Sequence, residues 1–196
     1  MDRATLASIC VLGYPGAVNR MLVLVVLAWT FGCGGAGPYG YAREYVPLGA
    51  EEPHLESATE ITYEEVRRDP VDFQSTKVGW FGVVTGVSVD GNGAGTITMT
   101  YRTLSARNLC DDERDSSCRV TVSEREGGPF AAQVQLRDNE LSGEKKLWIG
   151  SLVKIYGTPT GELDPESGGP VLRAEFHRHW PRGTYVTTGA RGNMRR

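Results

Sequence analysis

Apolar and polar residues alternate along most of the second half of the chain, a pattern typical of β-strands. Residues 96–104 alternate strictly, which predicts a strand with one buried face. Residues 77–90 carry apolar side chains on both alternating faces, which predicts a strand buried on both sides. Between these two segments, Gly91-Asn92-Gly93 predicts the turn of a β-hairpin.

The same periodicity predicts further strands later in the chain. They are expected at 119–123, 130–136, 147–157 and 171–180, with an edge strand at 184–188. Within 171–180, alternation places Phe176 and Trp180 inward and His177 and His179 outward.

A short helix is predicted before the strands, at 62–73. Thr62 and Glu65 have the spacing of a capping box, and Pro70 ends or bends the helix. One short helix followed by five or six strands, the first of them long, predicts an all-β fold, a small OB-like Greek-key barrel. A generic β-sandwich is the alternative that the same pattern permits.

The N-terminal part has a different pattern. Arg20 precedes an unbroken apolar run over 21–31, and Gly32 and Cys33 follow it. The run is too short for a membrane helix and has the length of a signal-peptide core. A small residue before a cysteine predicts lipidation at Cys33, as in bacterial lipoproteins, with ordinary cleavage near 34–36 as the alternative.

These patterns predict four regions. Residues 1–32 are the N-terminal extension and signal peptide, 33–60 a lipidated flexible tether, 61–188 the barrel domain and 189–196 a disordered tail. The predicted location is the periplasmic face of a bacterial outer membrane, held by a lipid anchor at Cys33.

The charge and the motifs of the chain disfavour two classes of function, nucleic-acid binding and catalysis. The chain has 21 basic and 24 acidic residues and a formal net charge of −3. A nucleic-acid partner is therefore not expected, because binding to phosphates needs a basic surface. No phosphate-binding loop, nucleophile elbow, zinc-protease motif or dinucleotide fingerprint occurs, so we expect no enzyme and no cofactor.

Two cysteines remain after Cys33, namely Cys110 and Cys118. In an oxidising envelope this even pair predicts a disulfide that closes a short acidic loop. The alternative is a metal or redox pair, which the seven-residue spacing does not favour.

Two groups of side chains are candidates for binding. Four aromatic residues could form a ligand face on the barrel, and ordinary core packing is the alternative interpretation. These residues are Trp80, Tyr101, Trp148 and Tyr156. His177 and His179 are two positions apart on a strand, so they face the same way, but two nitrogens do not complete a metal site. We expect both to be solvated, and we predict no metal.

The chain resembles the Slp family of bacterial outer-membrane lipoproteins. The matching segments are Asp69-Pro70, Val78–Val83, Tyr101 with Leu104, Gly150–Gly157 and Trp180-Pro181. The resemblance implies an OB-like fold, an association with envelope stress and no assigned catalytic residues. The expected function is a non-catalytic scaffold that contacts other envelope proteins. The alternative is a module that binds an oligosaccharide, a peptidoglycan fragment or a small molecule on the barrel face.

Overall fold

The computed structural model describes residues 45–109 and 118–190. The predicted signal, Cys33, residues 34–44, Cys110 and most of the predicted tail lie outside these ranges. The helices are α2 (Glu52–Ser57), α3 (Tyr63–Arg68) and α4 (Asp138–Leu141). The strands are β1 (Val78–Val89), β2 (Ala94–Arg102), β3 (Arg107–Asn108), β4 (Val120–Val122), β5 (Glu126–Gln135), β6 (Leu152–Leu163), β7 (Pro170–Trp180) and β8 (Tyr185–Thr187).

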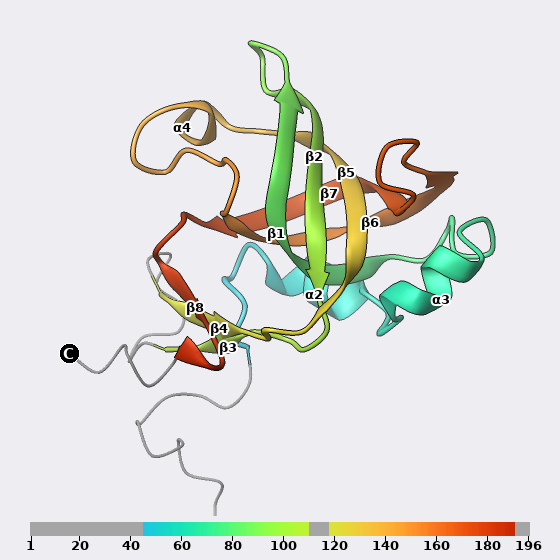
Figure 1. The fold of residues 1–196 in the computed structure, drawn as a ribbon, viewed down its shortest axis with the longest axis horizontal. Coiled ribbons are helices and arrows are strands. Elements are labelled where there is room, and N and C mark those ends of the chain that lie inside the picture. The colour runs from blue at the N-terminus through green and yellow to red at the C-terminus, as the bar shows by residue number, and fades with distance from the viewer. Residues whose placement is uncertain (1–44, 110–117, 191–196) are drawn as a thin grey trace, which may run out of the picture. The chain divides into compact units, whose positions relative to one another are not determined.

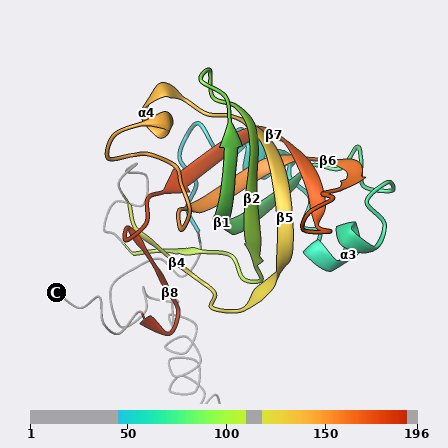
Figure 2. The same ribbon diagram turned by 45° about the horizontal axis from the view of Figure 1, so that its top comes forward.

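Five of the strands form a closed barrel in the order β1-β2-β5-β7-β6 (Figures 1 and 2). The neighbours pair antiparallel except β5 and β7, whose parallel pairing closes the barrel. This is the small all-β, OB-like barrel that the sequence predicts. Among the described helices, none has the length and apolar content needed to cross a bilayer.

The first half of the long strand β1 is buried on both faces, as its two-sided pattern predicts, whereas residues 85–89 are exposed or half-buried. Trp80 and Val84 point into the barrel core, whereas Phe81 and Val83 point outward into a second apolar cluster. Gly82 also faces inward, and an added Cβ there would lie 2.7 Å from the ring of Phe130. A glycine at this position therefore lets the barrel wall approach its core.

The second apolar cluster lies between the outer face of the barrel and a three-stranded sheet in the order β3-β4-β8. Its buried members come from both layers: Phe81, Ala106, Val120, Val122, Leu152 and Trp180. The edge strand predicted at 184–188 is β8, and it pairs parallel with β4.

The predicted flexible tether over 33–60 is wrong for its described part. Residues 45–60 contain α2, and Glu51 in this segment is completely buried. The segment is ordered because it packs on the barrel: the ring of Tyr45 lies 5.3 Å from that of Phe81, and His54 stacks on Phe176 at 4.8 Å. The folded part of the chain therefore begins at or before Tyr45, not at residue 61.

The predicted helix is present as α3, and its capping box is confirmed. The Thr62 side chain accepts from the Glu65 amide, and the Glu65 carboxylate accepts from the Thr62 amide at 2.8 Å. Two further short helices, α2 and α4, accompany it.

The predicted inward and outward faces of β7 are inverted in its second half. The register with β6 shifts so that Glu175 has no opposite residue, and an added Cβ at Gly157 beside it would collide with the Arg173 carbonyl. An extra residue in one strand moves every later side chain to the other face. His177 and His179 therefore lie opposite Ile155 and Val153 of the barrel core, and the exposure expected for these histidines is wrong.

Strand β6 begins later than predicted, at Leu152, and continues to Leu163. Residues 147–151 form a turn instead, because Gly150 adopts a φ of +89° and the Ser151 amide bonds back to the Trp148 carbonyl. A positive φ suits glycine and interrupts an extended strand.

Candidate functional site

A groove lies beside the end of β1. Its volume is about 550 Å³, within the range of ligand-binding pockets. Figure 1 shows α4 and the loop after it beside this end of β1. The lining is mostly apolar: Val87, Val89, Leu136, Leu141, Leu147, Trp148 and Ile149, with Asp90, Gly91, Glu140 and Lys146. We call this feature the Trp148 groove.

Three of the six large hydrophobic side chains exposed in the described residues line this groove. Trp148 is 54% exposed, Ile149 61% and Val87 36%. Single exposed apolar residues are ordinary on a protein surface, but a contiguous patch marks an interaction site.

The loop that carries Trp148 and Ile149 is anchored at both ends. On one side Leu147 is buried, and its amide bonds to the Glu140 carbonyl at 2.8 Å. On the other, the Gly150 amide bonds to the Val84 carbonyl at 2.8 Å. These backbone contacts flank Trp148 and Ile149 and so fix the position of the loop that lines the groove.

The buried carboxylate of Glu140 also lines the groove. Glu140 is 1% exposed and accepts hydrogen bonds from both histidines of β7, at 3.0 Å from His177 Nε2 and 3.0 Å from His179 Nδ1. The Arg137 guanidinium donates to the same carboxylate at 2.7 Å. These contacts fasten α4 to the barrel wall and so support one side of the groove.

The charge of Glu140 is stabilised in this place. Burial alone would raise the pKa of the Glu140 carboxyl, but hydrogen bonds from His177, His179 and Arg137 outweigh burial and hold that pKa well below its usual range. The other nitrogen of His179 lies 2.8 Å from the Lys145 carbonyl. Both nitrogens of this ring thus lie within hydrogen-bond distance of oxygens.

Glu140, His177 and His179 do not form a metal centre in the structure. No group of three or more histidine, cysteine, aspartate or glutamate side chains among the described residues is placed to hold a metal ion. His177 and His179 instead satisfy a buried carboxylate that sequence reasoning did not single out.

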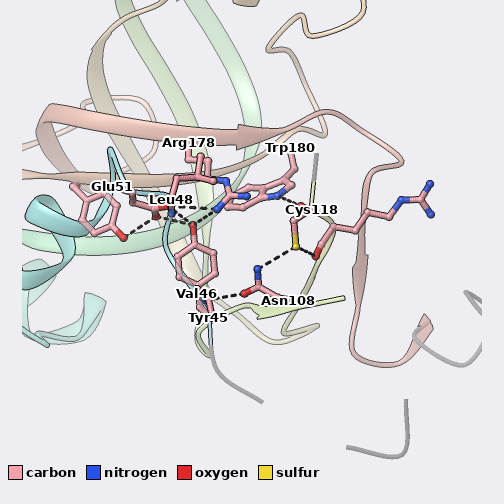
Figure 3. A network of polar contacts seen from close by, with 10 residues as sticks. Tyr45, Val46, Leu48, Glu51, Asn108, Cys118, Arg178 and Trp180 are labelled. Carbon is pink, nitrogen blue, oxygen red and sulfur yellow. Dashed lines mark hydrogen bonds and ion pairs between the residues drawn. The ribbon is translucent and has the colours of Figure 1, made fainter. Parts of the chain in front are cut away.

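A second buried polar cluster fastens the N-terminal segment to the outer face of the barrel (Figure 3). The carboxylate of Glu51 accepts from the hydroxyls of Tyr45 at 2.6 Å and Tyr156 at 2.8 Å, and from the Leu48 amide at 3.1 Å. Arg178 lies 3.5 Å away and also donates to the Tyr45 hydroxyl at 3.1 Å. We call this the Glu51 cluster.

Lys154 adds a second cation to the Glu51 cluster, beside Arg178. It is 4% exposed, and its ammonium lies 4.4–5.0 Å from the ring centroids of Phe81, Tyr45 and Tyr156. Burial lowers the pKa of Lys154 to about 8, with Arg178 adding to the effect and Glu51 opposing it. Burial and the Glu51 charge raise the pKa of both tyrosines above the usual range.

The four aromatic residues predicted as a ligand face do not share one. Trp80 and Tyr101 meet at 5.5 Å in an edge contact beside a cavity of only about 150 Å³. Tyr156 lies on the outer face, completely buried beneath the N-terminal segment, and Trp148 stands alone in its groove. Trp80 and Tyr101 therefore pack in or against the barrel core, Tyr156 belongs to the Glu51 cluster, and an aromatic barrel face is not assembled.

The predicted disulfide remains a prediction, because Cys110 lies outside the described residues. Cys118 is 2% exposed and sits at the base of the second sheet, where its sulfur accepts from the Asn108 side-chain amide at 3.1 Å. Figure 3 shows how Asn108 also holds the N-terminal segment, through the Val46 amide at 2.8 Å.

Sequence reasoning missed Glu51, Arg178 and Glu140. Glu51 stands in a segment without periodicity, and Arg178 is adjacent to histidines that were expected to be solvated, so neither carries a local signal of burial. Glu140 stands three positions after Arg137, a spacing that suits helical ion pairs but is common on exposed surfaces.

No protein-family model matches the chain, and no curated protein matches it.

Proposed function

We propose that this protein is a lipid-anchored, non-catalytic scaffold of the bacterial cell envelope, which contacts other envelope proteins through the Trp148 groove. The single observation that carries the contact role is the gathering of exposed Trp148, Ile149 and Val87 in one groove. Trp is one of the residue types enriched at the energetic centre of protein interfaces.

The anchoring part of the proposal rests on the sequence. The apolar run after Arg20 and the Gly32-Cys33 pair have the form of a lipoprotein signal, and the short motifs over 69–181 resemble those of the Slp family. Outer-membrane lipidation at Cys33, export and the disulfide between Cys110 and Cys118 are all parts of this proposal.

The number of residues between Cys33 and the described fold limits how far the barrel can lie from the membrane. Because the described fold includes Tyr45, at most residues 34–44 lie between it and Cys33. An extended chain of this length spans roughly 40 Å. The barrel would therefore be held near the membrane surface, where neighbouring envelope proteins are concentrated.

Two measurements test the proposal separately. Cys33→Ser should move the protein from the membrane fraction to the soluble fraction, and unchanged membrane partitioning would refute the anchor. A photo-crosslinking amino acid at Trp148 should yield a discrete protein adduct in the native envelope, and one at Leu104, which is 62% exposed elsewhere, should not. Equal labelling from both positions would refute the docking role.

A further inference from the structure

One edge of the barrel is left open inside the Trp148 groove. Strand β1 pairs with β6 only over Val78–Val83, and two hydrogen bonds to residues 150 and 151 extend this contact to Val84. On the other side, β1 continues to pair with β2 as far as Val89. Within residues 45–109 and 118–190, no strand pairs with 85–89 on the β6 side.

The backbone groups that face this open edge belong to Val87 and Val89. The Asp90 amide bonds to the Ala94 carbonyl at 2.9 Å, so Asp90 and Ala94 are a hydrogen-bonded pair of the hairpin. Hydrogen-bonded residues alternate along an antiparallel strand. Ser88 therefore bonds toward β2, and Val87 and Val89 direct their N–H and C=O groups away from β2, toward the groove.

The side chains that line the groove beside this edge determine which kind of segment can bind there. Trp148, Ile149, Leu141 and Leu147 line the groove together with Val87 and Val89 of this edge. The edge is about 16 Å long at 3.3 Å per residue. The edge is short and lies beside apolar side chains, so it suits one extended segment whose alternate side chains are apolar.

We propose that the Trp148 groove binds an extended segment of a partner protein, which adds a strand to the open edge of β1. The partner backbone bonds to Val87 and Val89, and its alternate apolar side chains enter the groove beside Trp148 and Ile149. In strand addition, main-chain hydrogen bonds provide affinity and side-chain pockets provide specificity. This inference rests on the proposed function and specifies the partner's chemistry.

The direct test is backbone hydrogen exchange on the full chain in detergent micelles. The probe is a pool of eight-residue peptides that alternate apolar and polar residues. We expect binding at about 1 mM or better, with at least tenfold slower exchange at the Val87 and Val89 amides. Ser88, already bonded to β2, should not change. A pool that does not bind, or that binds without protecting Val87 and Val89, would overturn the inference.

Two controls separate backbone pairing from apolar contact. Peptides methylated on alternate amide nitrogens should lose binding about tenfold, since they keep their side chains but lose donors. In the protein, Val87→Pro removes an edge N–H, whereas Val87→Thr keeps it, so only the first should weaken binding. Equal binding of the methylated and unmethylated peptides contradicts strand addition whether or not Val87→Pro folds. The assay does not depend on the anchor at Cys33. A failure of strand addition can therefore be distinguished from a failure of membrane anchoring.

Discussion

The hydroxyl of Tyr156 donates a 2.8 Å hydrogen bond to the carboxylate of Glu51, which lies 105 positions earlier in the chain. This contact joins the segment nearest the predicted anchor to the wall of the barrel. Because Glu51 is completely buried, its charge depends on the donors around it.

Removing the Glu51 carboxylate should destabilise the fold. Glu51→Ala leaves Arg178 and the hydroxyls of Tyr45 and Tyr156 without their shared acceptor, and we expect a loss of about 3 kcal/mol in the free energy of unfolding. Chemical denaturation measures it, with Glu56→Ala on the exposed side of α2 as the control. An equal effect of both variants would show that the Glu51 cluster is not what fastens this segment.

The lysine in the same cluster should oppose stability at neutral pH. The pKa of Lys154 is lowered to about 8 from 10.5, so between these values the unfolded chain binds more protons than the folded one. Unfolding free energy should therefore rise with pH from about 8 to about 10, above which the raised pKa values of Tyr45 and Tyr156 act in the opposite direction. Lys154→Met should abolish the rise and increase stability at pH 7 by about 1 kcal/mol.

The matched control is Lys145→Met, because Lys145 is exposed. It should change stability by less than about 0.5 kcal/mol. A lower stability of Lys154→Met at pH 7 would show instead that contacts with the three aromatic rings outweigh the cost of burying the ammonium.

Acid should weaken the attachment of α4 through Glu140. Its folded pKa lies below the unfolded value, so its contribution is present above about pH 4.3 and is lost as pH falls below that value. Glu140→Gln should reduce stability at pH 7 by about 2 kcal/mol and flatten the acid limb of the pH profile. A variant with an unchanged acid limb would contradict this assignment.

Gly82 tests how closely the barrel is packed. A Cβ at this position would lie 2.7 Å from Phe130 and 2.8 Å from Met99, so Gly82→Ala should cost about 1–3 kcal/mol through overpacking. Gly91 in the hairpin turn has open space around its Cβ position, and Gly91→Ala is the control. Thermal unfolding compares the two, and equal midpoints would mean that the core accommodates the methyl group.

The strands were largely predictable because their signal is local. The two-sided apolar pattern of β1 and the Gly91-Asn92-Gly93 turn give the first hairpin, and the capping box of Thr62 and Glu65 gives α3. In each case the residues that determine the element are neighbours in sequence.

The site was less predictable because its partners are distant in sequence. The bulge at Glu175 arises from how β6 and β7 meet at Gly157, and it reverses the faces of His177 and Arg178. Glu51 is buried by Tyr156 and Arg178, more than a hundred positions away. Alternation within one strand contains no information about either event.

The proposal of a lipid-anchored scaffold is tested most directly by the mass of the mature N-terminal peptide, purified from the membrane of the native host. We expect a peptide that begins at Cys33 and carries covalently attached acyl chains. A mature chain that begins at any other residue, or an unmodified thiol at Cys33, would contradict it.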